Sequence, residues 1–505
     1  MNRKIIIYII PFILGSISSF SLPPYNLVFL NFLTFPLLYL FFLKNYNSSK
    51  FVAFSIGWIF GFGYFIFSLH WITNSLTFDE SYKKLIPFSI ILIPFFLGIF
   101  YGLFTLFLSW FNLRLNIYSI LLFAAIFSMI EFIRGSVFGG FPWNLIAYSW
   151  TNYINNLQIL SFIGTYSFNL LSITFFLGPL ILLMSNTKTK KIIFTVGFTS
   201  LILINYFYGA YTVENFNKKK QEKLQVNIKI ISPKIEIKKY FEQNSIKLIA
   251  KELIKLSNPN KSKKTIFIYP EGIFTGLYLD DLNYLQNIFK NNFSNNHKLI
   301  FGITSLEKKK IFNSMVLLNN NFELLSKYNK NKLVPFGEFL PFENLFKKAG
   351  IKKITYGYNS FSPDSKRDLF NISNLKFLPL ICYEIIYSGR LNSQKKNFDI
   401  ILNISEDGWF GEKIGPEQHF SHSVFRAIEE GKNIIRSSNN GISAFINPKG
   451  DVVKKIESTQ KGVIVINSLR YAETTIFSKY GNKIFFYFLI FYITLIFFLK
   501  KKKGT

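Results

Sequence analysis

The sequence contains very few of the residues that build disulfides and metal sites. Its 505 residues include one cysteine and four histidines, and charged side chains make up only 17%, against about 25% in an average soluble protein. A single cysteine excludes a disulfide framework and any cysteine-rich metal site. Hydrophobic residues, in contrast, make up 50% of the chain. A disordered chain is therefore excluded, and the protein is not expected to be soluble throughout.

Acidic residues are also scarce, which leaves a large positive charge. The chain has 28 Asp and Glu against 58 Lys and Arg, a formal net charge of +30. Lys, Asn, Ile and Phe are enriched together, as an AT-rich coding sequence would produce, and no basic stripe accompanies a nucleic-acid recognition motif. We therefore expect no nucleic-acid partner.

Long apolar runs dominate the N-terminal part of the chain. A helix needs about 20 mainly apolar residues to cross the hydrocarbon of a bilayer. Segments close to that length lie at 4–20, 27–43, 52–71, 86–111, 117–134, 159–184, 191–211 and 484–499. We expect a membrane domain with 8 transmembrane helices, the first of which is retained rather than cleaved as a signal peptide.

The loops between these segments differ in charge. One set carries most of the basic residues, whereas the alternate set holds little beyond Lys83, Lys84 and Arg134. Because cytoplasmic loops are enriched in Lys and Arg, both termini should be cytoplasmic. Seven spans then place residues 212–483 outside.

Residues 212–483 have a different pattern, in which short apolar runs alternate with helical periodicity. This pattern predicts an α/β or α+β sandwich. The expected strands are Val226–Ile231, Thr265–Tyr269, Leu299–Ile303, Ser314–Leu318, Phe377–Ile381, Ile400–Ile404, Ile442–Ile446 and Val463–Ile466. The expected helices cover 241–256, 280–291 and 418–435, and Asn- and Lys-rich stretches such as 319–332 are expected to be loops. The expected domains are 1–211, 212–483 and 484–505.

Three segments of the outer domain carry residues that could act together. Cys382 and Glu271 each follow an apolar strand, and residues 328–338 supply lysines beside a turn fixed by Pro and Gly. A lone cysteine is more often a small buried hydrophobe. As a nucleophile, however, a thiol needs a base or a nearby cation. A carboxylate can take its proton, and a lysine ammonium can stabilise the thiolate and an oxyanion.

The order of these motifs resembles the nitrilase superfamily. Pro-Glu at 270–271, Tyr-x-Lys-x-x-Leu-Val-Pro-Phe-Gly-Glu at 328–338 and Ile-Cys-Tyr-Glu at 381–384 carry the resemblance. With membrane spans around an outer domain, the whole chain resembles the apolipoprotein N-acyltransferases, the membrane-embedded members that complete bacterial lipoprotein maturation. Further matching segments lie at 131–135, 140–143, 404–411, 415–419 and 436–443.

The resemblance implies a nitrilase-like αββα sandwich and gives each residue a role. Glu271 would be the general base, Lys330 the oxyanion-stabilising cation and Cys382 the nucleophile. The family's spacing to the motif glutamate selects Lys330 over Lys332. The supporting or substrate-binding residues would be Glu338, Tyr383, Glu384, Tyr240 and Trp143. No metal and no cofactor is expected.

Two residues depart from the family pattern. Glu406 precedes Asp407 where the family usually has Asn, and Tyr240 stands where it usually has a Trp. Both departures concern substrate positioning more than the class of reaction.

The resemblance also implies the reaction and its place. An acyl chain would pass from a membrane phospholipid, through a thioester on Cys382, to the N-terminal amine of the diacylglyceryl-cysteine of an apolipoprotein. The enzyme would be a multi-pass protein of the bacterial inner membrane with residues 212–483 in the periplasm.

Other interpretations remain open from the residues alone. A membrane-tethered amidase could use the same Glu-Lys-Cys triad with water as acceptor, and a thiol hydrolase could pair Cys382 with His419. His419 and His422 have the i, i+3 spacing of metal ligands, but a helix-surface or motif-supporting role is preferred. A transporter would need charges inside the membrane, and the sequence offers chiefly Glu131 and Arg134.

The loop charges give a test of orientation. A cysteine introduced at Asn258 should react with a membrane-impermeant maleimide in intact spheroplasts, because residues 212–483 are expected outside. A cysteine introduced at Thr187, beside a basic loop, should not react. Labelling at Thr187 without labelling at Asn258 would invert the orientation.

Overall fold

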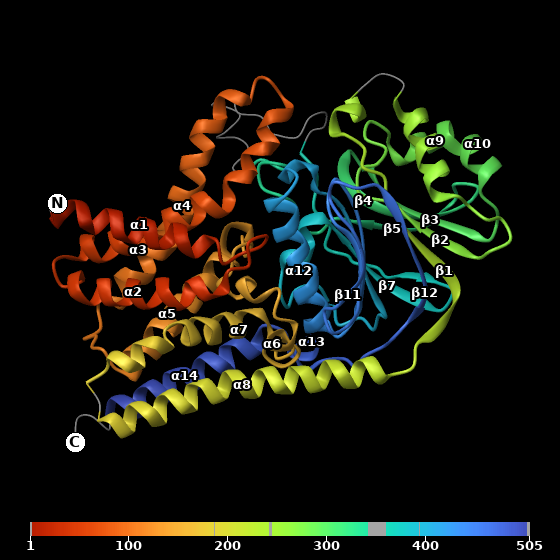
Figure 1. Cartoon of the computed structure of the whole chain (residues 1–505). Coiled ribbons are helices and arrows are strands. Elements are labelled where there is room, and N and C mark those ends of the chain that lie inside the picture. Colours follow the sequence, from red (N-terminus) through yellow and green to blue (C-terminus); the bar gives the residue numbers. More distant parts are fainter. Residues whose placement is uncertain (1–2, 186, 242–244, 342–359, 393, 502–505) are drawn as a thin grey trace. The chain divides into compact units, whose positions relative to one another are not determined.

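The chain forms two compact units in a computed structural model (Figure 1) that describes residues 3–185, 187–241, 245–341, 360–392 and 394–501. The helical unit contains Met1–Thr73, Leu85–Asn217 and Thr475–Thr505. The sheet unit contains Asn74–Lys84 and Lys218–Thr474.

Apolar helices build the helical unit. They are α1 (Arg3–Ser19), α2 (Asn31–Asn45), α3 (Lys50–Leu69), α4 (Ile86–Leu108), α5 (Ile117–Arg134), α6 (Ile154–Leu157), α7 (Leu160–Phe176), α8 (Lys188–Lys218), α13 (Ile476–Tyr480) and α14 (Lys483–Lys501). A helix satisfies its own backbone hydrogen bonds, which is what a bilayer interior requires. Helix α8 continues past residue 211, where the sequence suggested a domain boundary, to Lys218.

Seven helical segments in the described part of the chain are long and apolar enough to cross a membrane. They are Val28–Asn45, Lys50–Phe78, Lys83–Leu108, Ile117–Arg134, Leu160–Leu183, Lys188–Lys218 and Lys483–Lys500. Helix α1 is also apolar but has only 17 residues. The expected count of eight spans therefore stays a prediction.

A buried ion pair and an aromatic cluster lie inside the helical unit. Arg134 donates two hydrogen bonds to the carboxylate of Glu131, at 3.0 and 2.8 Å, and a third to the carbonyl of Phe141 at 2.5 Å. The two intramembrane charges that the sequence offers therefore form an ion pair with each other. Trp143 is buried beside them, with ring centroids 5.0 Å from Trp71 and 6.2 Å from Phe141.

Two six-stranded sheets form the core of the sheet unit. Their orders are β12-β1-β2-β3-β4-β5 and β11-β10-β9-β8-β7-β6. The strands are β1 (Glu222–Ser232), β2 (Thr265–Ile268), β3 (His297–Glu307), β4 (Lys310–Asn319), β5 (Leu324–Asn329), β6 (Phe370–Ile372), β7 (Leu375–Ile381), β8 (Ile400–Glu406), β9 (Asn433–Asn439), β10 (Ser443–Ile446), β11 (Val452–Ile456) and β12 (Gly462–Leu469). In each sheet three neighbouring strands are parallel, β1-β2-β3 and β7-β8-β9, and the outer pairs are antiparallel.

Helices cover the sheets and the sheets face each other, which gives the layer order helix, sheet, sheet, helix. The covering helices are α9 (Ser245–Ser257), α10 (Asn283–Asn292) and α12 (Ile414–Glu430). Leu253 of α9 and Leu285 of α10 join one buried cluster with Phe267 of β2, whereas α12 packs against β9 and β10. Between the sheets, the Ser437 hydroxyl of β9 donates to the Ile231 carbonyl of β1 at 2.9 Å.

Each strand that the sequence predicts is present, but two other expectations are wrong. The expected loop 319–332 contains β5, whose sequence has no continuous apolar run. The helix expected over 418–435 ends at Glu430. Gly431 follows with φ 63°, a left-handed conformation that stops a helix, and β9 begins at Asn433.

Candidate active site

Glu271, Lys330 and Cys382 lie at the ends of three strands in the sheet unit. Glu271 follows β2, Lys330 follows β5 and Cys382 follows β7, so both sheets contribute. All three are buried, with 8%, 1% and 5% of their surface exposed. The fold therefore brings together three residues that are far apart in the sequence.

Lys330 and Glu271 belong to one hydrogen-bonded cluster with Glu338 and Asn313. The Lys330 Nζ lies 2.9 Å from Glu338 Oε1 and 3.4 Å from Glu271 Oε1. The Asn313 side chain, from β4, donates to the same two oxygens at 2.7 Å each. The other oxygen of Glu338 accepts from the peptide N–H of Val334 at 2.8 Å. Glu338 thus holds both the ammonium group and the turn that leads to it.

Burial and charge together set the protonation of this cluster. Burial alone would lower the pKa of Lys330, but Glu271 and Glu338 raise it well above its ordinary value. Burial raises the pKa of Glu271, with Lys330 opposing and Glu338 adding to the rise. Burial and Glu271 also raise the pKa of the Cys382 thiol, against the effect of Lys330. A thiol that keeps its proton needs a base when it attacks, and Glu271 is the carboxyl available.

The backbone at Cys382 is held in an unusual conformation. Cys382 begins the turn η9 (Cys382–Ile386) with φ 49°, a left-handed value that side-chain-bearing residues rarely adopt. Such a conformation persists where the surroundings hold it. Glu384 Oε2 accepts from the peptide N–H of Ile381 at 2.8 Å, and the His419 Nε2 lies 3.2 Å from the Cys382 carbonyl oxygen. These contacts fix the chain on both sides of the thiol.

Glu384 also connects the cysteine turn, Cys382–Ile386, to the lysine loop, residues 330–338. Its Oε1 accepts hydrogen bonds from the Tyr328 hydroxyl and from the peptide N–H groups of Asn331 and Lys332, at 2.6, 2.9 and 3.2 Å. Arg367 supplies the opposite charge at 2.8 Å. Glu384 therefore fixes the position of Cys382 relative to Lys330.

A second buried ionic cluster supports the cysteine turn from α12. Asp407 lies 2.8 Å from His419 Nδ1 through one oxygen and accepts from Arg436 at 2.6 Å through the other. Burial opposes ionisation, but Arg436 and His419 hold the pKa of Asp407 well below its ordinary value. The cluster is tightly packed: a Cβ at Gly441 would lie 2.2 Å from an Asp407 oxygen, so glycine is required there.

His419 and His422 are fully buried, so the expected helix-surface position is wrong. His419 contacts the Cys382 carbonyl, which agrees with the motif-supporting role. Cys382, Asp407 and His419 offer ligand atoms within 4.8 Å of one another. However, an Arg436 nitrogen lies 3.0 Å from His419 Nδ1, the ring nitrogen that contacts Asp407. A cation there would face the guanidinium charge. The other ring nitrogen of His419 meets the Cys382 carbonyl, which does not favour a thiol–histidine pair.

The remaining residues predicted from the sequence lie in both units. Tyr240, in η7 (Ile237–Phe241), is buried and donates its hydroxyl to Glu406 Oε2 at 3.2 Å. Tyr383 is buried next to the thiol, and its ring meets that of Tyr387 edge-on at 5.5 Å. Trp143 belongs to the helical unit.

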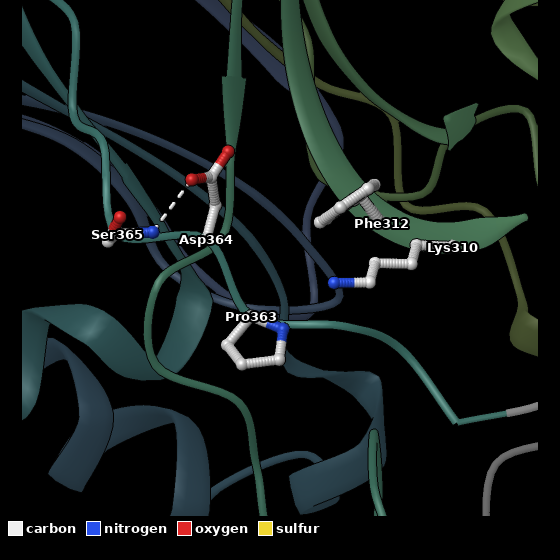
Figure 2. Close-up of a pocket in the computed structure, with 5 residues that line it drawn as sticks. All are labelled: Lys310, Phe312, Pro363, Asp364 and Ser365. Atoms are coloured by element: carbon white, nitrogen blue, oxygen red, sulfur yellow. Dashed lines mark hydrogen bonds between the residues drawn. The ribbon is translucent and has the colours of Figure 1, made fainter. Parts of the chain in front are cut away.

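A pocket of about 370 Å³ lies near the lysine loop (Figure 2). It is lined by Lys310, Phe312, Pro363, Asp364 and Ser365. The peptide N–H of Asp364 donates to the Lys330 carbonyl at 3.1 Å. The pocket is thus a neighbour of the candidate site, and its lining includes none of Glu271, Lys330 and Cys382.

Sequence reasoning did not assign four residues that the structure places in these clusters. Asp407 and Arg436 lie within motifs of the resemblance, but their partnership needs β8 and β9 to be neighbours. Arg367 and Asn313 carry no motif, and nothing in the sequence distinguishes Asn313 from the many other asparagines.

The two-sheet sandwich with a buried glutamate, lysine and cysteine at its strand ends defines a carbon–nitrogen hydrolase domain, and a family model described as "Carbon-nitrogen hydrolase" matches residues 266–471. A second model, "Apolipoprotein N-acyltransferase N-terminal domain", matches residues 14–178. The chain belongs to the apolipoprotein N-acyltransferase family and is an acyl-transferring enzyme.

Relatives match over nearly the whole chain. The apolipoprotein N-acyltransferase of Rhizobium leguminosarum bv. trifolii is 30% identical, and the match covers 89% of this chain and 88% of the relative. That of Wigglesworthia glossinidia brevipalpis is also 30% identical, covering 90% of each chain. Among solved structures, an amidase from Nesterenkonia sp. AN1 has a TM-score of 0.36 and 14% identity over 49% of this chain and 92% of its own.

The ionic cluster beside Cys382 predicts a large loss of stability on neutralising Asp407. Asp407→Asn should lower the free energy of unfolding by about 3–5 kcal/mol, because it leaves Arg436 buried without its counter-ion. Since the folded pKa of Asp407 is lowered, its contribution is present above about pH 4 and is lost as the pH falls further. Chemical denaturation of the purified protein at pH 7 measures the change.

Asp368→Asn is the matched control. Asp368 pairs with Lys396 at 2.9 Å, but its side chain is 68% exposed, so the loss should be no more than about 1 kcal/mol. Equal losses in the two variants would contradict the structural importance given to the buried cluster.

Proposed function

We propose that this enzyme N-acylates apolipoproteins at a membrane. It takes an acyl chain from a phospholipid and passes it, through a thioester on Cys382, to the α-amino group of a diacylglyceryl-cysteine. The observation that carries the proposal is the buried cluster of Glu271, Lys330 and Glu338 beside the single thiol of the chain. The names of the relatives support the class of acceptor.

In the first half-reaction, Cys382 Sγ attacks the carbonyl carbon of a phospholipid ester while its proton passes to Glu271. The Lys330 ammonium stabilises the oxyanion of the tetrahedral intermediate. The ester C–O bond then breaks, and Glu271 returns the proton to the departing glycerol oxygen. The products are a lysophospholipid and a thioester on Cys382.

In the second half-reaction, the amine of the diacylglyceryl-cysteine attacks the thioester carbon. Glu271 takes a proton from the attacking nitrogen, and Lys330 again stabilises the oxyanion. The C–S bond breaks, the Cys382 sulfur recovers a proton, and an amide is left on the lipoprotein. The enzyme returns to its starting state without any external oxidant or reductant.

The helical unit would hold the enzyme in the membrane, where both lipid substrates are found. Seven segments of membrane-spanning length support an integral membrane protein. The loop charges favour placing the sheet unit outside the cytoplasm, which for a protein of the bacterial inner membrane is the periplasm. In this arrangement the eight expected spans would hold the two greasy substrates, and Tyr240, Tyr383 and Trp143 are candidates for contact with them. Glu338 and Glu384 act as supports of Lys330 and Cys382.

The distinction between Lys330 and Lys332 tests the assignment of the triad. Glu271→Gln, Lys330→Met and Cys382→Ala should each abolish acyl transfer from phospholipid to a diacylated lipopeptide while the protein stays folded. Lys332→Met should keep most of the activity, because Lys332 is exposed and contributes only its peptide N–H to Glu384. Losses should be far from additive when triad substitutions are combined. An inactive Lys332→Met with an active Lys330→Met would refute the assignment.

The thioester is tested by trapping it. Incubation with phospholipid alone should add a fatty-acyl mass to the peptide that contains Cys382, removable by neutral hydroxylamine and absent in Glu271→Gln. Cys382→Ser should not form the adduct, since an alkoxide is much harder to generate than a thiolate. Mass spectrometry of the digested protein measures the adduct.

Addition of a diacylated lipopeptide should clear the adduct and yield the N-acylated product. Clearance by water at the same rate would favour the alternative function, a membrane-tethered amidase that uses the same triad. An unmodified Cys382 during active turnover would end the thioester proposal.

A further inference from the structure

Glu406 is a buried carboxyl group with an unusual set of partners. Only 5% of its surface is exposed, and its two oxygens accept four hydrogen bonds. The donors are the Tyr240 hydroxyl at 3.2 Å, the Asn439 amide at 2.7 Å, the Asn440 amide at 3.1 Å and the Gly408 peptide N–H at 2.9 Å. All four donors are uncharged, so within the described residues this carboxyl, unlike Asp407 or Glu384, has no cation among its hydrogen-bond partners.

The partners come from three separate segments. Tyr240 lies on η7, the two asparagines lie at the end of β9, and Gly408 lies in η10 (Asp407–Phe410). Asn439 also binds the backbone of Ile235, accepting from its N–H at 2.9 Å and donating to its carbonyl at 2.8 Å. The Glu406 side chain therefore connects the end of β8 to η7, to the end of β9 and to η10.

The same residue contacts the proposed general base through its backbone. The peptide N–H of Glu406 donates to Glu271 Oε2 at 3.0 Å, while Glu271 Oε1 faces Asn313 and Lys330. This N–H therefore fixes the rotation of the carboxylate that is to accept the thiol proton. Gly302 allows the Glu271 backbone to pack this closely against β3, because a Cβ at residue 302 would lie 2.6 Å from the Glu271 Cα.

We infer that the Glu406 carboxyl, held by Tyr240 and the two asparagines, is a positioning residue that keeps its own peptide N–H aimed at Glu271. The inference rests on the proposed function only in taking Glu271 as the base. A carboxylate can accept from four donors, whereas an amide of the same size accepts from two and sets its own N–H groups against the others. The type of side chain at 406 thus matters, and not only its volume.

Burial works against the ionised form of Glu406, and its hydrogen-bond donors work for it. Burial, and then the charge of Asp407, raise the pKa of Glu406 to about 8, although the Asn439, Asn440 and Gly408 donors oppose the rise. Glu271 and Tyr240 are the other titratable groups that face this carboxyl. The comparison of Glu406 with Gln is therefore made above about pH 8, where the ionised form that accepts all four hydrogen bonds prevails.

The test compares three single variants of the full-length protein in phospholipid vesicles. Glu406→Gln should lower kcat for transfer to a diacylated lipopeptide by about a hundredfold, the cost of a misplacement of about 1 Å, and leave KM for the phospholipid unchanged. Tyr240→Phe removes one of the four donors and should lower kcat several-fold, again without a change in KM. Glu412→Gln, the same substitution at an exposed position of the neighbouring loop, should behave as the wild type.

A second readout needs no lipid substrate. The rate at which iodoacetamide alkylates Cys382 depends on removal of the thiol proton, so Glu406→Gln should slow it while the wild type and Glu412→Gln react equally. If the wild type transfers no acyl chain but this difference persists, the proposed function fails and the inference stands. If Glu406→Gln does not fold, Tyr240→Phe decides by the same two measurements.

Two results would overturn the inference. Wild-type kcat and wild-type alkylation rates in folded Glu406→Gln and Tyr240→Phe would show that the network does not act on Glu271. A raised KM with unchanged kcat would show instead that Tyr240 and Glu406 contact the phospholipid. The double variant should be no slower than Glu406→Gln, since Tyr240 is inferred to act through Glu406, and an additive loss would count against it.

Discussion

The burial of one ammonium group, that of Lys330, is the constraint on which the site depends. Moving such a group out of water costs several kcal/mol unless opposite charges and hydrogen bonds replace the lost solvent. With 1% of its surface exposed, Lys330 meets that cost through Glu338 and Glu271. Burial raises the pKa of Glu271 and of the Cys382 thiol, and negative charge adds to the rise, from Glu338 at Glu271 and from Glu271 at the thiol. The chemistry of the site follows from burial together with these charges.

The same constraint explains why the supporting contacts are rigid. The strand ends that carry Glu271, Lys330 and Cys382 come from two different sheets, so small shifts between the sheets would separate the charges. Glu384 prevents this by binding the lysine loop and the cysteine turn with one carboxylate. The Asp407 cluster supports the turn from α12. Glu384 and the Asp407 cluster can therefore affect the reaction without contacting a reacting atom.

The sequence was sufficient for the parts of the structure that depend on local pattern. Apolar runs predicted the helices and most strands, and motif order predicted that Glu271, Lys330 and Cys382 share one domain. It was not sufficient for β5, whose apolar positions are interrupted, or for the partners of Arg367 and Asn313, which only the strand order brings near. Residue-by-residue comparison also treated Tyr240 and Glu406 as two independent departures, whereas they are in hydrogen-bond contact.

The two carboxylates beside Lys330 also explain how one base can serve both proposed half-reactions. A base that accepts a proton from a thiol and later returns it to an alcohol works best with a pKa near the working pH, and burial moves Glu271 in that direction. When Glu271 takes the proton it becomes neutral and its attraction for Lys330 weakens. The Glu338 carboxylate lies 2.9 Å from the Lys330 ammonium, so the ammonium keeps this partner and stays in place to meet the oxyanion. With only one carboxylate beside it, the Lys330 ammonium would lose that attraction at the step in which it stabilises the oxyanion.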